Sequence, residues 1–185
     1  MRFRLYAVML CSVAAGAVLV SQAQTVLGQG SPAQKPLSPP ATANVSLPGA
    51  TITIDYSAPS VKGRTIFGGL VPYDKVWRTG ANAATTLKTT GNLKIGDLTV
   101  PAGTYTLYSL PSANGWKLIV NKQTGQWGTV YNEGQDLGRT SMDVASAGAP
   151  AETMVIDFEK TSGNSTELHV KWASQDASVR VTAGK

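Results

Sequence analysis

The fold is decided by residues 103–121, with the sequence GTYTLYSLPSANGWKLIVN. Two parts of this stretch, 103–110 and 116–121, are rich in β-branched and aromatic residues, which favour strands. Between them, Asn114-Gly115 is a dipeptide that readily takes the positive φ angles of a type I′ turn. The stretch therefore predicts an antiparallel hairpin, with Trp116 on its buried face.

Short strand-like segments continue on both sides of this hairpin. In residues 51–56, apolar and polar side chains alternate, as they do in a half-buried strand. Further strands are predicted at residues 85–89, 93–95, 98–100, 153–159, 166–172 and 179–181. Eight or nine short strands with frequent Gly, Pro and Asn turns predict an all-β, antiparallel domain of the β-sandwich or jelly-roll type.

The N-terminal residues have the pattern of an export signal. Residues 1–4 form a short leader with two arginines, and residues 5–20 are apolar or small. Ser21-Gln22-Ala23 then supplies small residues at the positions that a signal peptidase reads. We expect residues 1–23 to be a signal peptide and the mature chain to start near Gln24, in the periplasm or outside the cell. The apolar stretch is too short for a comfortable transmembrane helix, so we expect no membrane span after its removal.

Residues 24–49 follow this signal and have the composition of a spacer. They contain five prolines, no acidic residue and no apolar periodicity. Such a segment is typically flexible and partly polyproline-like. We therefore expect a flexible spacer over residues 24–49 and a single β domain over residues 50–185.

Composition excludes several classes of function. The only cysteine, Cys11, lies in the predicted signal, and the only histidine, His169, shares the polar face of a predicted strand, where we expect it to face solvent. With one histidine and no mature cysteine, a His/Cys zinc site is excluded and a Ser-His-Asp triad is disfavoured. We expect no metal and no cofactor. The basic residues are scattered singly, which argues against nucleic-acid binding.

Two long irregular segments, residues 57–84 and 122–137, are where a β scaffold would carry a binding site. The first contains WRTGAN at residues 77–82. Together with PAGTY at residues 101–105, Trp127-Gly128 and the pair Asp136 and Arg139, these segments resemble the family of exported bacterial proteins called domain of unknown function 2911 (DUF2911).

The resemblance covers about residues 50–172. It implies an exported bacterial β domain, and it assigns no activity and no catalytic residue. In the family an acidic residue often follows the asparagine of the WRTGAN stretch, where this chain has Ala83. A role for such an acid therefore does not carry over.

The residues of these loops support two interpretations. In the functional one, guanidinium, amide and aromatic groups converge on a concave surface and bind a ligand. The candidate ligand-binding residues are Arg64, Tyr73, Trp77, Arg78, Asn82 and Trp127. In the structural one, Arg78 forms a buried ion pair with Asp55 or Asp136, Asn82 caps a turn, and the two tryptophans fill the core.

Three functions follow from these interpretations. The preferred one is a non-catalytic binding module for a small polar ligand, such as a saccharide or a cell-wall fragment. An alternative is a glycan hydrolase that uses two carboxylates, with Asp55 and Asp136 as the first candidate pair. A third is an envelope protein that binds another protein along a sheet edge. The sequence carries no signal for an oligomeric state.

Overall fold

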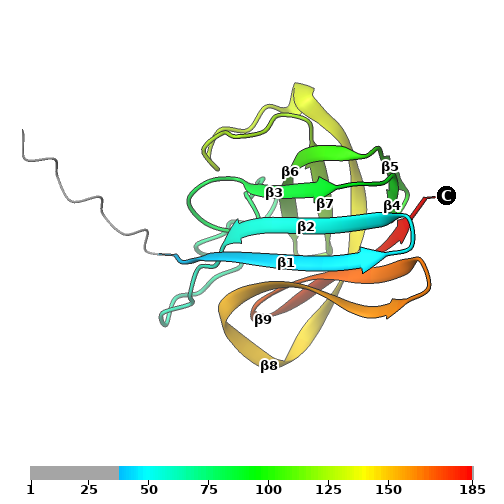
Figure 1. The fold of residues 1–185 in the computed structure, drawn as a ribbon. Coiled ribbons are helices and arrows are strands. Elements are labelled where there is room, and N and C mark those ends of the chain that lie inside the picture. The colour runs from blue at the N-terminus through cyan, green and yellow to red at the C-terminus, as the bar shows by residue number, and fades with distance from the viewer. Residues whose placement is uncertain (1–37, 185) are drawn as a thin grey trace, which may run out of the picture. The chain divides into compact units, whose positions relative to one another are not determined.

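The computed structural model describes residues 38–184, which form nine strands and one short 3₁₀ helix (Figure 1). The elements are β1 (Pro40–Leu47), β2 (Ala50–Ser57), β3 (Thr85–Thr89), β4 (Leu93–Ile95), β5 (Leu98–Val100), β6 (Gly103–Ser112), β7 (Gly115–Asn121), η1 (Glu133–Gln135), β8 (Asp136–Ser162) and β9 (Ser165–Ala183). Within this range, no helix has the length and apolarity that a bilayer span requires.

The strands hydrogen-bond in one continuous order, β1-β2-β3-β6-β7-β8-β9-β4-β5, and every pair is antiparallel. The long strand β8 pairs with β7 near its start and with β9 over the rest of its length. Figure 1 shows β8 sweeping behind β1 to β3, so that the sheet folds back on itself. All nine strands contribute apolar side chains to one core.

The predicted all-β, antiparallel class is confirmed, and three strands have the predicted bounds. These are β3, β4 and β5, each a short segment between turn-forming residues. Because the nine strands form a single order, the finer description as a sandwich or jelly roll stays a prediction.

The first strand corrects the predicted spacer. Residues 40–47 form β1, which pairs with β2 along its whole length. Its inward positions, Ala41, Ala43, Val45 and Leu47, are buried or half-buried, while Thr42, Asn44 and Ser46 are exposed. Two of the four inward residues are alanines, so the alternation is weak in hydrophobicity. The β domain begins ten residues before the predicted boundary at 50; residues 1–37, with the predicted signal, lie outside the described part.

The central hairpin is confirmed, but its turn is not of type I′. β6 and β7 pair from Thr106 opposite Asn121 to Ser112 opposite Gly115. A type I′ turn needs positive φ at both central residues. Because Ser112 pairs with Gly115, the central residues are Ala113 and Asn114, and neither is among the residues with positive φ. Asn114 donates its backbone N–H to the hydroxyl of Ser112 instead.

The last two strands are longer than predicted. The segment 153–159 is the middle of a 27-residue strand, and the segments 166–172 and 179–181 are both parts of β9. Most of residues 143–153 are exposed and small or polar, so they lack the apolar alternation that predicts a strand. β9 continues through a backbone irregularity at Ala173, where φ is 51°.

The irregular segment between β2 and β3 supplies a large part of the core. Ile66, Val71 and Trp77 from this segment are all buried. Trp77 stacks on Trp172 with ring centroids 5.7 Å apart, and Phe67 meets Trp116 edge-on at 4.7 Å. The segment is therefore held in place by aromatic packing, which fixes the residues that follow it.

Candidate ligand-binding site

The WRTGAN residues form a tight turn that is hydrogen-bonded at both ends. Trp77 exchanges two backbone hydrogen bonds of 2.8 Å with Ser109 of β6, so it lies beside β6 like a short extension of the sheet. Its indole N–H donates to the carbonyl oxygen of Gly80 at 3.1 Å. The Trp77 side chain thus packs in the core and closes the turn at the same time.

The backbone of this turn is strained. Thr79 has φ 50° and Asn82 has φ 57°, and left-handed backbone is a genuine outlier for a β-branched residue such as Thr. Buried hydrogen bonds compensate: the Thr79 and Ser109 hydroxyls are 2.8 Å apart, and the Thr85 hydroxyl donates to the Thr79 carbonyl at 2.8 Å. Such strain persists only where the surroundings enforce it, and it is common at functional sites.

A cavity of about 330 Å³ lies beside this turn, at the small end of the range for ligand pockets. Four of the six candidate residues line it: Arg64, Trp77, Arg78 and Asn82. Sequence reasoning did not include Lys62 or Trp172, which also line it. Lys62 stands two residues from Arg64 and could have been found there, whereas Trp172 comes from β9 and only the fold brings it here.

Arg78 has no ionic partner among residues 38–184. The interpretation of Arg78 as an ion-pair tie to Asp55 or Asp136 is therefore wrong: Asp55 pairs with Lys88, and Asp136 pairs with Arg139. The Nε of Arg78 is buried without a hydrogen-bond partner among these residues. Burial lowers the pKa of Arg78, because desolvation disfavours its charged form.

The stem of Arg78 is held by close packing against Gly128. A Cβ placed on Gly128 would lie 2.0 Å from the Cδ of Arg78 and 2.7 Å from the carbonyl oxygen of Asn82. Glycine is therefore required here for close approach. A second hollow of about 280 Å³, which includes Gly128 and Tyr131, shares Trp77 and Arg78 with the first.

The other two polar candidates have hydrogen bonds that fix their positions. The Asn82 side-chain amide donates to the carbonyl of Ser38 at 3.1 Å, which ties the turn to the residues before β1. Arg64 donates to the carbonyls of Val61 and Ser60, at 2.9 Å and 2.6 Å. Arg64 is exposed, so its charge remains accessible at the cavity.

Tyr73 and Trp127 are not brought to the cavity. Tyr73 is 39% exposed and borders a different hollow, between the β6–β7 turn and β8. Trp127 is 58% exposed, so the interpretation that it fills the core is wrong. Its backbone forms an isolated antiparallel β-bridge with Ala83, next to Asn82. Its side chain lines neither the cavity of about 330 Å³ nor the hollow of about 280 Å³ beside Arg78.

A family model described as "Protein of unknown function (DUF2911)" matches residues 38–181. The chain belongs to the DUF2911 family. The match begins two residues before β1 and ends within β9, so the DUF2911 unit and the β domain coincide. Neither the comparison with curated proteins nor that with solved structures found a match.

The two carboxylates of the hydrolase alternative are far apart in the DUF2911 domain. Asp55 and Asp136 occupy one row across the sheet, with β3, β6 and β7 between their strands. Four inter-strand spacings amount to roughly 19 Å along the sheet, against the ~5–9.5 Å that glycosidase carboxylates need. The Lys88 hydrogen bond also lowers the pKa of Asp55, which keeps it ionised.

Asp136 organises the second irregular segment. Its carboxylate accepts hydrogen bonds from the Asn121 amide at 2.8 Å, the Tyr131 hydroxyl at 2.7 Å and the Arg139 Nε at 3.0 Å. Residues 122–135 thereby fold over the outer face of β6 and β7, where the Tyr108 hydroxyl donates to the Val130 carbonyl. Asp136 in the DUF2911 domain thus has a complete set of structural partners.

The pKa of Tyr131 predicts how the stability of the domain changes at high pH. Burial, followed by the hydrogen bond to Asp136, raises its pKa to about 12. A pKa raised above the unfolded value of about 10 contributes stability that is full below pH 10 and is lost as pH rises toward 12. We expect the unfolding midpoint of Tyr131→Phe to depend less on pH between 10 and 12 than that of the wild type, by thermal unfolding monitored with circular dichroism. Identical pH profiles would contradict this.

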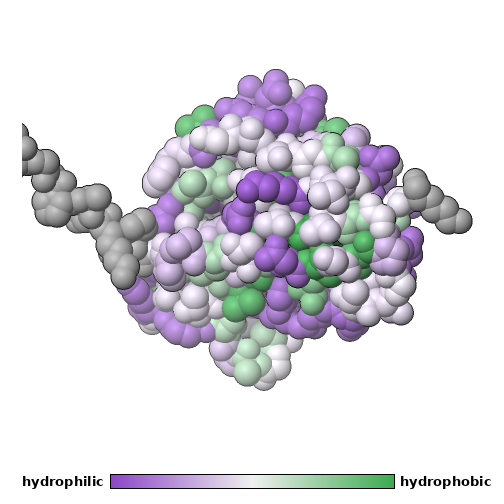
Figure 2. Space-filling view, viewed as in Figure 1, coloured by the Kyte–Doolittle hydropathy of each residue, from purple (hydrophilic) through white to green (hydrophobic). Residues whose placement is uncertain are grey.

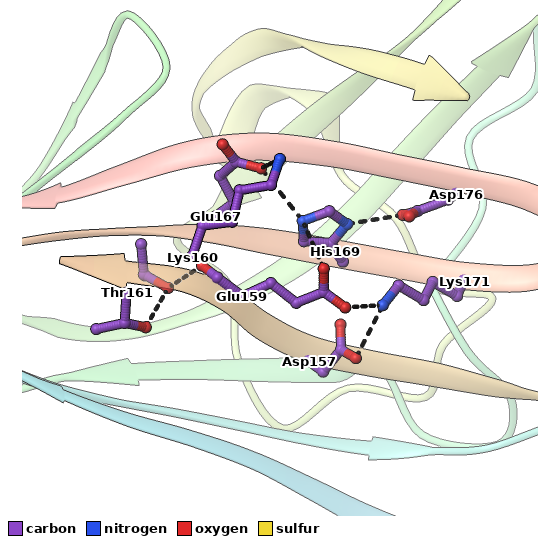
Figure 3. A network of polar contacts seen from close by, with 9 residues as sticks. Asp157, Glu159, Lys160, Thr161, Glu167, His169, Lys171 and Asp176 are labelled. Carbon is purple, nitrogen blue, oxygen red and sulfur yellow. Dashed lines mark hydrogen bonds and ion pairs between the residues drawn. The ribbon is translucent and has the colours of Figure 1, made fainter. Parts of the chain in front are cut away.

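His169 corrects another prediction, because it is 5% exposed rather than solvent-facing. Its Nδ1 lies 2.9 Å from Asp176, and its Nε2 lies 3.4 Å from Glu167 and 3.8 Å from Glu159 (Figure 3). Glu167 is two residues from His169 on β9, as alternation predicts. Glu159 comes from β8 and Asp176 from β9 beyond its irregularity at Ala173, so alternation does not reveal these two acids.

Lysines pair with two of the three acids around His169, Glu159 and Glu167. Lys171 pairs with Asp157 and Glu159, and Lys160 pairs with Glu167 at 2.8 Å (Figure 3). These hydrogen bonds lower the pKa of Glu159 and of Glu167. Two buried atoms of this network, the Nε2 of His169 and one carboxylate oxygen of Asp157, have no hydrogen-bond partner among the described residues. No group of three or more His, Asp and Glu side chains in residues 38–184 is arranged to hold a metal ion.

The exposed apolar residues do not form one dominant area on the face shown in Figure 2. There, apolar residues occur in several separate places among hydrophilic ones. A partner-binding surface usually has a larger contiguous patch. This face of the DUF2911 domain therefore offers no specific support for the protein-interaction alternative.

Proposed function

We propose that this protein is an exported, non-catalytic binding module for a small polar ligand, which it holds in the cavity beside residues 77–82. One observation carries the proposal: Arg78, half-buried at the cavity wall, has a guanidinium without an ionic partner among the described residues. Burying a charge is costly unless it is paired. A bound ligand that accepts its hydrogen bonds would supply the missing partner.

The lining residues favour binding over catalysis. They combine an aromatic base, formed by Trp77 and Trp172, with polar groups from Arg78 and Asn82. Aromatic faces and edges with a few directed polar groups are the usual composition of saccharide and small-molecule sites. Among residues 38–184, no Asp, Glu or His lines the cavity, so this part of the chain brings no carboxylate or imidazole there for general acid or base work near pH 7.

The test is a titration of the protein, labelled with ¹⁵N, against monosaccharides, disaccharides and short cell-wall peptides, followed by amide chemical shifts. We expect saturable shifts in residues 60–82 with at least one class of compound. Arg78→Gln should remain folded, with an unfolding midpoint within about 2 °C of the wild type, because no ion pair is lost. Saturable shifts confined to other regions would refute the proposed site.

Export is the part of this proposal that rests on residues 1–23. We expect the protein recovered from outside the cytoplasm to begin at Gln24, as read by N-terminal sequencing. Recovery of the full-length chain from the cytoplasm alone would contradict it.

A further inference from the structure

The ionisable side chains that line the cavity all carry the same sign of charge. In the described range they are Lys62, Arg64 and Arg78, and no acidic residue of that range joins them. Glu152 contacts this segment, where it accepts a hydrogen bond from the backbone N–H of Lys62 at 2.9 Å. It does not line the cavity, so the space beside Arg78 is positive.

The partly buried charge of Arg78 favours an anionic ligand over a neutral one. Its guanidinium is partly desolvated, and this burial opposes its positive charge. A sugar hydroxyl can accept a hydrogen bond but leaves the charge uncompensated. A carboxylate or phosphate both neutralises the charge and matches the planar fork of the guanidinium with two parallel hydrogen bonds.

The surroundings confine the stem of Arg78 in advance of binding. The Arg78 stem is confined by Gly128, where there is no room even for a methyl group. The next residue, Thr79, is locked in its strained conformation by the hydroxyl of Ser109. A side chain whose stem is confined before binding loses less entropy on binding, which favours Arg78 as the group that contacts a ligand.

We propose that the ligand of this cavity is a small molecule that bears a carboxylate or phosphate group, bound through that group by Arg78. The exposed Lys62 and Arg64 add to the attraction, and the volume of about 330 Å³ limits the bound part to a small molecule. This inference rests on the proposed function, since it assigns the chemistry of the same site.

The test compares matched pairs of probes that differ by one anionic group. N-acetylmuramic acid is compared with N-acetylglucosamine for the carboxylate, and glucose 6-phosphate is compared with glucose for the phosphate. We expect at least one anionic member to bind more tightly than its neutral partner, with shifts in residues 60–82. Its affinity should fall as salt rises, because the attraction is electrostatic. Tighter binding of N-acetylmuramic acid would indicate a carboxylate ligand, and tighter binding of glucose 6-phosphate would indicate a phosphate ligand.

Two variants make the test specific to Arg78. Arg78→Gln should weaken binding of the anionic probe by ~10–100-fold, the usual loss for a charged hydrogen bond, while the protein stays folded. Arg180→Gln is the matched control, because Arg180 lies on β9, contacts Ser165 and is not among the residues lining the cavity; it should leave binding unchanged.

The outcomes separate this inference from the proposed function. Equal affinity for neutral and anionic probes at the cavity, with no effect of Arg78→Gln, would overturn the anion inference and leave the binding module intact. No saturable shift at the cavity with any of the four probes or with the wider panel would overturn both.

Discussion

Trp77→Ala should lower the stability of the domain by about 3–5 kcal/mol, the usual cost of truncating a buried Trp. Trp77 is 8% exposed, stacks on Trp172 and lies edge-on to Trp116 at 6.2 Å. Its loss leaves a cavity among these rings and removes the hydrogen bond to Gly80. Thermal unfolding monitored by circular dichroism should show a midpoint lower by on the order of 10 °C.

The matched control is Trp127→Ala, which removes the same side chain from a position that is 58% exposed. We expect a change within about 0.5 kcal/mol. If Trp77→Ala does not fold, Trp77→Phe should still fold with a smaller loss, because it keeps part of the ring packing. Equal midpoints for the Trp77 and Trp127 variants would mean that the segment 58–84 does not pack as described.

Asp136→Ala should cost about 2–4 kcal/mol, measured by urea unfolding. The side chain of Asp136 is 11% exposed, and its removal takes one acceptor from each of Asn121, Tyr131 and Arg139. Asn121 keeps the Asn132 carbonyl and Arg139 keeps Glu133 as acceptors. Breaking a buried charged network is expensive because the remaining partners stay desolvated. Arg139 is partly exposed, so water recovers some of the loss.

Asp143→Ala is the control for this variant. Asp143 lies on the same strand, is exposed, and has no ion pair or side-chain hydrogen bond among the described residues; its loss should change stability by less than about 0.5 kcal/mol. A D136A protein as stable as D143A would contradict the structural role of Asp136.

The strands that could be predicted from sequence are those with strong local signals. β3 to β5 are short, apolar on one side, and bounded by Gly, Asn or Pro. β1 was missed because half of its inward residues are alanine, which has little hydrophobic contrast with Ser and Thr. The start of β8 was missed because its pairing is decided by β7 and β9 rather than by its own residues.

The cavity could be predicted only where its residues are close in sequence. Trp77, Arg78 and Asn82 share one turn, so their proximity follows from the chain itself. Whether Arg78 had an acidic partner could not be known, because Asp55 and Asp136 lie on other strands and pair with other bases. The burial of His169 likewise depends on Asp176, which reaches it only because β9 bends at Ala173.

The pairing of the last strand with β4 affects how the chain can fold. Leu93 lies opposite Ala183, at the very end of β9, so this part of the sheet joins residues from the middle and the end of the chain. Before β9 has emerged, β4 can pair only with β5, and most of β8 has no partner strand. Pairings this distant in sequence slow folding to milliseconds or seconds in comparable β domains. The domain therefore acquires its stability only once β9 is available to pair, rather than strand by strand as the chain emerges.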